Sequence, residues 1–273
     1  MTRIRRAAVA GSWYPGESTR LAAEVDGYLA SAEVSPVPRL RAIVAPHAGL
    51  MYSGPVAAFS YKAAQTTPYR TIVMVGPSHF VPFHGVSIWS TGAWQTPFGN
   101  VAVDERLAAA IGAAAPDLIS ERPDAHGREH SLELQLPFVA HLWPGAEIVP
   151  LVMGQQTRQT AFTLGDALAT SVDGRDDVLL VASSDLSHYE DAGTAAAMDA
   201  VVMQHVAALD PEGLMDALDQ QPRHACGGGP MVAVLHGARG LGATHAKVLH
   251  YADSGDVSGD KSAVVGYMAA GVF

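Results

Sequence analysis

The sequence has very little cysteine and few charged side chains. Its single cysteine, Cys226, cannot form an internal disulfide, so packing must stabilise the fold. Charged residues make up 16% of the chain and hydrophobic residues 48%, a balance typical of a globular protein with a sizeable core. The 17 lysines and arginines against 27 aspartates and glutamates give a net charge of −10. A general nucleic-acid binder needs a basic face, so we expect no nucleic-acid partner.

Long apolar segments are absent as well. No stretch approaches the roughly 18 uninterrupted apolar residues of a membrane-spanning helix, so we expect no membrane segment. Near the N-terminus, Gly11 and Ser12 interrupt the chain before a secretory apolar segment could form, which predicts a cytoplasmic protein. Because no linker-like stretch or long repeat divides the chain, we predict a single domain over residues 1–273.

Apolar segments rich in β-branched residues alternate with alanine-rich segments along most of the chain. The first kind predicts buried strands, at 40–45, 71–75, 146–153 and 178–182. The second kind predicts helices, at 56–64, 104–114, 132–142, 159–171 and 192–209. A repeated strand-helix order is typical of a mainly parallel sheet with helices on both faces. The sequence therefore predicts an α/β fold, specifically an α/β/α sandwich.

Two regions depart from this alternation. Residues 86–104 alternate in polarity between turn signals, which predicts an antiparallel excursion. Residues 246–251 and 263–269 flank a polar stretch, and we expect them to pair as C-terminal edge strands.

Histidines follow several of the predicted strands. His47 follows the first strand and His79 the second, while Asp185 and His188 follow the fourth. Ligands gather beyond the carboxyl ends of parallel strands. His47 and His79 are 32 residues apart, about one strand-helix-strand unit, so we expect neighbouring strands to place them at one sheet edge. A lone histidine in such a loop often only bonds a backbone carbonyl, but three such loops together favour a shared site.

The chain's one thiol lies in a similar context. Cys226 stands in a glycine-rich segment just before a predicted helix with Pro230 in its first turn. The helix dipole and free backbone N–H groups at that point favour a thiolate. Two imidazoles with the Asp185 carboxylate would form a set that suits non-haem iron(II). Two imidazoles with the Cys226 thiolate would suit copper, or zinc. Both ligand sets stay open at this stage.

Two further residues are candidates for a pocket. Tyr52 could donate a hydrogen bond to a ligand or serve as an amphipathic core tyrosine. His130 lies beside Ser131, which could cap the following helix, and His130 could then face a substrate. We predict Tyr52 and His130 as substrate-binding residues.

Several motifs together resemble one family. In chain order they are AVAGSWYPG, APHAGLMYSGPVAA, VGPSHF, TPFG, EHSLELQLPF, SSDLSHY and ACGGGP. The same order is seen in the Memo-like family, whose bacterial members are called AmmeMemoRadiSam system protein B. The resemblance extends from about Ala8 to the C-terminal strand. It implies a fold similar to that of the catalytic subunits of class III extradiol dioxygenases, which are non-haem iron(II) enzymes.

The resemblance also implies roles for individual residues. His47 and His79 match metal-binding histidines, and Asp185 and His188 match further site residues, with His188 as the catalytic acid or base. Cys226 matches the cysteine that Memo-like proteins have where the dioxygenases use a glutamate ligand. A thiolate there would change the electronics of the metal and could itself be oxidised. Tyr52 and His130 match positions that line the pocket.

These observations leave three hypotheses for the function. The first is a metal-binding protein, with iron or copper and redox or oxygenase-like chemistry on a small-molecule or peptide substrate, and so a metal-dependent oxidoreductase. The second is a true extradiol ring-cleaving dioxygenase with Asp185 as the third ligand. The third is a non-catalytic binding or scaffold protein that kept the pocket. The resemblance adds radical-enzyme system partners, and a homo-oligomer stays open.

Overall fold

Four parallel strands form the centre of the main sheet. The computed structural model describes residues 3–273. The central strands lie in the order β2 (Ala42–Ala45), β9 (Val178–Ser183), β3 (Thr71–Pro77) and β8 (Glu147–Met153). Neighbours in this group all pair in parallel. Nearly every residue in them is buried, which is why they appear in the sequence as continuous apolar segments.

Further strands extend the sheet on both sides. β12 (Val264–Val272) pairs antiparallel with β2 and with β11 (Ala246–Asp253), while β10 (His188–Glu190) pairs with the start of β12. On the other side β4 (Val86–Ile88) runs antiparallel to β8 and is followed by β7 (Ile119–Ser120). The antiparallel C-terminal pair is confirmed, with β11 at the edge and β12 joining it to the parallel strands.

A second, smaller sheet contains the rest of the antiparallel excursion. β5 (Ala93–Thr96) and β6 (Gly99–Ala102) form a hairpin, and β1 (Ile4–Arg5) pairs with β5 in parallel. The excursion predicted at 86–104 is therefore confirmed, with β4 in the large sheet and β5 and β6 in the small one.

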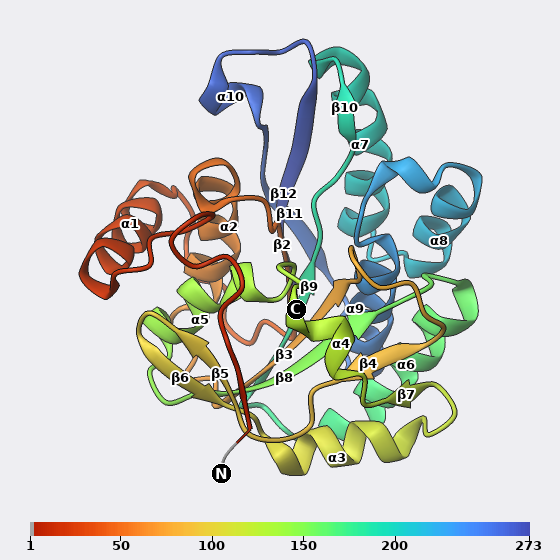
Figure 1. The fold of residues 1–273 in the computed structure, drawn as a ribbon. Coiled ribbons are helices and arrows are strands. Elements are labelled where there is room, and N and C mark those ends of the chain that lie inside the picture. The colour runs from red at the N-terminus through yellow and green to blue at the C-terminus, as the bar shows by residue number, and fades with distance from the viewer. Residues whose placement is uncertain (1–2) are drawn as a thin grey trace.

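Helices cover both faces of the large sheet (Figure 1). α9 packs on β9 and β3, and α6 packs on α9, while α2 packs on β2 and β12 with α1 beside it. The helices are α1 (Ser18–Ser31), α2 (Leu50–Ala64), α3 (Glu105–Ala114), α4 (Pro123–Gly127), α5 (Leu136–Leu142), α6 (Arg158–Val172), α7 (Ala192–Ala207), α8 (Pro211–Gln220), α9 (Gly228–Gly240) and α10 (Gly255–Ser258). The described residues also form two short 3-10 helices, η1 (Glu133–Gln135) and η2 (Pro222–His224).

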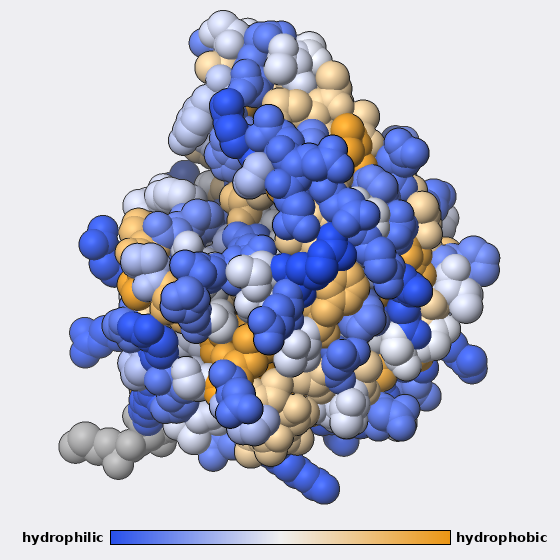
Figure 2. Space-filling model, turned by 90° about the vertical axis from the view of Figure 1, so that its right-hand side faces the viewer, coloured by the Kyte–Doolittle hydropathy of each residue, from blue (hydrophilic) through white to orange (hydrophobic). Residues whose placement is uncertain are grey.

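The outer helices present polar residues to solvent. Figure 2 shows the side on which α6, α7 and α8 lie, where hydrophilic residues cover most of the surface and hydrophobic residues form separate patches. The apolar residues of α8 explain this pattern, because Leu214, Met215 and Leu218 are buried. Within residues 3–273, no helix has both the length and the apolar character needed to cross a membrane.

The strand order determines where the histidine loops meet. β2 and β3 are not neighbours, because β9 lies between them. The expectation that His47 and His79 follow adjacent strands is therefore wrong, since the chain inserts a later strand between two earlier ones. All three strands run in the same direction, so the loops after β2, β9 and β3 still meet at one edge of the sheet.

Candidate metal centre

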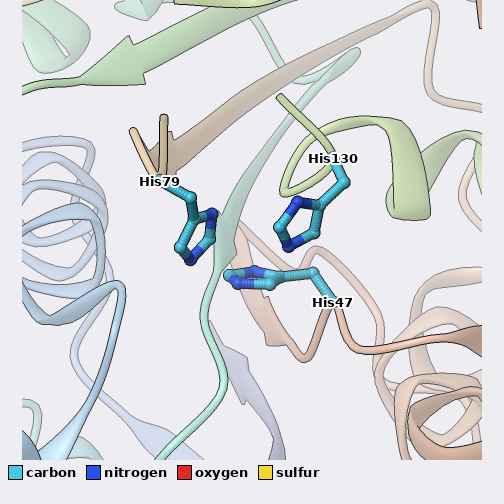
Figure 3. A group of neighbouring side chains, drawn as sticks. All are labelled: His47, His79 and His130. Carbon is cyan, nitrogen blue, oxygen red and sulfur yellow. The ribbon is translucent and has the colours of Figure 1, made fainter. Parts of the chain in front are cut away.

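Three histidines come together at this edge. His47 follows β2, His79 follows β3, and His130 lies in the loop between α4 and η1. One ring nitrogen from each lies within 4.8 Å of the others, and Figure 3 shows the three rings around a common point. The ring centroids of His79 and His130 are 4.5 Å apart, and that of His47 lies 5.3 Å from His79. The three side chains could therefore hold one metal ion.

A buried hydrogen-bond network orients His47. Its Nδ1 lies 2.9 Å from Oγ of Ser183. The Ser183 hydroxyl donates its proton to the carbonyl of Ser131 at 2.6 Å and accepts from Nε2 of Gln135 at 2.8 Å. Because that proton is already used, Nδ1 of His47 must be the donor to Ser183. Nε2 of His47 therefore carries no proton and can offer its lone pair to a metal.

A buried carboxylate orients His79. Oε1 of Glu129 lies 2.9 Å from Nδ1 of His79, and Oε2 accepts from the backbone N–H of His79 at 2.6 Å. Oε1 also accepts from the backbone N–H groups of His130 and Ser131. Burial alone would raise the pKa of Glu129, but these hydrogen bonds, chiefly from His79, lower the pKa to about 2. Glu129 is therefore ionised, and a carboxylate-histidine pair of this kind is typical of metal centres.

His130 belongs to the histidine group rather than to a helix start. Its ring stacks on that of His79 at an interplanar angle of 14° and lies 4.4 Å from the ring of Trp13. Ser131 does not cap a helix, because its hydroxyl donates to the carbonyl of Pro77 and η1 has no side-chain cap. The 3-10 helix η1 begins only at Glu133. The backbone N–H groups of His130 and Ser131, which precede it, donate to Glu129.

The environment keeps two of the imidazoles neutral. Burial lowers the pKa of His47 well below its usual value, and the nearby His79 and His130 lower it further. Burial also lowers the pKa of His130. A neutral imidazole is the form that binds a metal, so the site is prepared for ligation near neutral pH.

Cys226 lies against His47. Its Sγ is 3.2 Å from Nε2 of His47 and accepts from the backbone N–H of Asp185 at 3.3 Å. The expectation that the helix start makes Cys226 a thiolate is wrong for the metal-free protein. Burial raises the pKa of Cys226, and the charge of Asp185 raises it further. Cys226 is not one of the three residues whose ligand atoms all lie within 4.8 Å of one another.

Asp185 braces the loop that carries His47. Its Oδ1 accepts from the backbone N–H of His47 at 2.6 Å and from that of Ala48 at 3.3 Å. Burial raises the pKa of Asp185, although these hydrogen bonds oppose the shift. The carboxylate thus fixes the backbone beside the histidine, and its role as a metal ligand stays a prediction.

All the site residues predicted from the sequence line a single cavity of about 670 Å³. They are His47, Tyr52, His79, His130, Asp185, His188 and Cys226. Nδ1 of His188 donates to the carbonyl of Leu186 at 2.8 Å. Nε2 is the ring nitrogen that takes no part in this bond. The exposed side chains of Trp13, Met51 and Tyr189 add apolar surface to the lining.

Sequence reasoning missed the residues that hold the histidines in place. Glu129 hydrogen-bonds to His79, and Ser183, held by Gln135, hydrogen-bonds to His47. Trp13, from the N-terminal segment, packs its ring near that of His130. A glutamate directly before a histidine, and two serines before Asp185, were the available signals. Trp13 follows none of the predicted strands, and its one signal was its place in the AVAGSWYPG motif.

The fold and the site define an α/β protein with a candidate histidine metal centre beyond the carboxyl ends of its parallel strands. The family model for "Memo-like protein" matches residues 5–271. The chain belongs to the Memo-like family. A MEMO1 family protein of Methanothermobacter thermautotrophicus is 37% identical, with 97% of this chain and 98% of that protein covered. One from Ignicoccus hospitalis is 39% identical, with 97% of each covered.

A solved structure has a similar fold. It is that of the uncharacterized protein JW3007 from Escherichia coli K12, with a TM-score of 0.58 at 15% sequence identity. The match covers 84% of this chain and 99% of that protein. At this level of identity the likeness concerns the fold alone.

Proposed function

We propose that the protein binds one transition-metal ion between His47, His79 and His130 and uses it for redox or oxygenase-like chemistry on a small substrate. The observation that carries this proposal is the approach of their three ring nitrogens to within 4.8 Å of one another. Two of the rings have Nδ1 already bonded, to Ser183 and Glu129, so their Nε2 atoms are the ones available to a metal. Neutral imidazoles suit iron, copper and zinc.

Cys226 is the favoured further ligand. Its sulfur already lies 3.2 Å from Nε2 of His47, while Asp185 uses Oδ1 to hold two backbone N–H groups and has only Oδ2 left for a metal. A thiolate beside imidazoles makes a soft ligand set that suits copper, whereas Asp185 as ligand would suit iron(II). Zinc fits the donors but is not redox-active. A bound iron or copper ion would supply electron transfer to a small molecule held in the cavity.

His188 is the residue we assign to proton transfer. It lines the cavity, and because Nδ1 donates to Leu186, Nε2 is the ring nitrogen left to accept a proton from a bound molecule. Asp185 lines the same cavity, and we assign it as the second catalytic group. Tyr52 lines the cavity as well and would offer its hydroxyl to the substrate. The volume of about 670 Å³ suits a small molecule or one side chain of a peptide.

Reconstitution under anaerobic conditions tests the proposal. The metal-free protein is given Fe(II), Cu(I) or Zn(II), and bound metal and dioxygen uptake are then measured with a panel of catechols, other phenols and short peptides. We expect one metal per chain and uptake that disappears in His188→Gln while the metal stays bound. His141→Ala is the control, since His141 pairs with Asp26 and neither residue lines the cavity.

Each outcome distinguishes the hypotheses. Uptake with catechols and iron alone would favour the ring-cleaving dioxygenase. Peptide binding that is unchanged by chelation would favour the scaffold protein. Full activity of a variant with both His47→Ala and His79→Ala would contradict the proposal.

A further inference from the structure

A buried carboxylate lies behind His188, outside the cavity lining. Asp199 comes from α7 and is fully buried. Its Oδ1 accepts from the backbone N–H of Ser187 at 2.9 Å, and its Oδ2 accepts from the hydroxyl of Tyr251 at 2.8 Å. The carboxylate thus joins α7 and β11 to the loop that precedes His188, the first residue of β10. The proposed function gives it no role.

The bond from Ser187 to Asp199 acts on His188 through one peptide group. The N–H of Ser187 and the carbonyl of Leu186 belong to the same peptide unit, which is planar and trans. Its N–H and C=O therefore point in opposite directions. When Asp199 holds the N–H on one side, the carbonyl points to the other side, where Nδ1 of His188 donates to it at 2.8 Å.

The neighbouring strand leaves room for this arrangement and stabilises it. Gly266 of β12 accepts from the N–H of Leu186 at 2.8 Å and donates to the carbonyl of Ser187 at 3.0 Å. A Cβ atom on Gly266 would lie 1.9 Å from Oδ2 of Asp199, closer than any non-bonded contact allows. The carboxylate therefore occupies a position that only glycine leaves open.

We propose that Asp199 is a positioning residue that acts through the Leu186–Ser187 peptide group to hold His188 with its proton on Nδ1 and with Nε2 facing the cavity. A carbonyl oxygen can only accept, so the bond to Leu186 requires the Nδ1–H tautomer. Only the use made of Nε2 rests on the proposed function. The tautomer itself is a property of this chain without any metal.

Nuclear magnetic resonance of metal-free protein labelled with ¹⁵N-histidine tests the inference above neutral pH. His188→Gln assigns the His188 signals. We expect the Nδ1–H tautomer of His188 to dominate in the unsubstituted protein and to lose that dominance in Asp199→Ala, whose Ser187 N–H has lost its acceptor. Asp199→Asn should restore it, because the amide oxygen can still accept from Ser187.

Asp104→Ala is the matched control. Asp104 is also a buried carboxylate, and it binds Thr71 at the opposite end of β3. Its loss should lower stability and leave the His188 tautomer unchanged. Should Asp199→Ala fail to fold, Gly266→Ala displaces the carboxylate without removing it and should weaken the same tautomer.

An unchanged His188 tautomer in a folded Asp199→Ala or Gly266→Ala variant would overturn the inference. Failure of the proposed function looks different. A protein that retains no metal yet shows the tautomer change would disprove the metal centre and support the role of Asp199.

Discussion

Nε2 of His47 lies 3.2 Å from Sγ of Cys226, although the two residues are 179 positions apart in the sequence. Nδ1 of His47 is the donor to Ser183, so Nε2 is the acceptor and the thiol is the donor. Burial keeps that thiol protonated by raising its pKa. A metal ion bound to both atoms would therefore replace the thiol proton and release it to solvent.

The choice of metal should depend on this sulfur. Cys226→Ser replaces a soft ligand by a hard one of similar size, so we expect Cu(I) affinity to fall by more than about tenfold while Fe(II) affinity changes little. Competition with a chromophoric chelator under anaerobic conditions measures both affinities. Equal copper affinity in the two proteins would place the sulfur outside the ligand set.

The same thiol should react slowly when no metal is present. Alkylation needs the thiolate, and the raised pKa of Cys226 leaves little of it near neutral pH. Because the chain has one cysteine, mass spectrometry after iodoacetamide treatment reports on this residue alone. We expect the rate at pH 7 to lie well below that of a small free thiol and to rise once the protein is unfolded. A rate equal to that of the free thiol would show that burial does not raise the pKa of Cys226.

Glu129 should matter to metal binding without touching the ion. Glu129→Gln keeps the shape of the side chain but removes the charge that faces Nδ1 of His79. We expect metal affinity to fall by about 10–100-fold. The matched control is Asp26→Asn, which alters a histidine-carboxylate pair on the surface, at His141. Titration calorimetry should show the loss in the first variant only.

His126 should make stability depend on pH. Burial lowers its pKa from 6.5 to about 3, and the charge of Arg5 contributes. Between these values the unfolded chain takes up a proton that the folded chain does not. The contribution of His126 to the free energy of unfolding is therefore fully present above pH 6.5. It falls by about 1.4 kcal/mol per pH unit as the pH drops toward 3.

Urea unfolding at a series of pH values measures this dependence. His126→Gln removes the group and should flatten the slope between pH 6 and about 4, within the window set by its pKa of about 3. His84→Gln changes an exposed histidine and should leave the slope as it is. An unchanged slope in His126→Gln would mean that other groups carry the pH dependence.

Glu133, in η1, joins the N-terminal segment to the part of the chain that follows His130. Its buried carboxylate pairs with Arg5 and accepts from the N–H groups of Ala8 and Val9 and from the hydroxyl of Tyr14. Glu133→Ala leaves the Arg5 charge buried without its partner, so we expect a loss of about 3–5 kcal/mol in denaturant unfolding. A loss below about 1 kcal/mol would show that water replaces the carboxylate.

The central strands, and so their ends, were predictable because a strand buried on both faces appears in the sequence as a continuous apolar segment. Continuous apolar segments gave β2, β3, β8 and β9, and the polar residues after three of these strands gave His47, His79 and Asp185. The strand order was not predictable in the same way. The polarity pattern of each segment, taken alone, does not indicate that β9 lies between β2 and β3. That order depends on which distant segments pair with each other.

The part of the site that comes from loops was harder to place. His130 was predicted as a substrate-binding residue, yet its ring lies with His47 and His79, because Glu129 folds the loop around its own carboxylate. No periodic pattern marks such a loop. The supporting bonds of Ser183 and Gln135 join segments far apart in the sequence, and only the folded chain brings them together.

The metal content of four proteins tests the central claim most directly. The unsubstituted protein and the single variants His47→Ala, His79→Ala and His130→Ala are loaded with Fe(II) or Cu(I), passed through a desalting column and assayed by plasma emission. One metal per chain in the unsubstituted protein, with a large loss in each variant, is the predicted result. Equal metal in all four proteins, or none in any of them, would contradict a centre built on these three histidines.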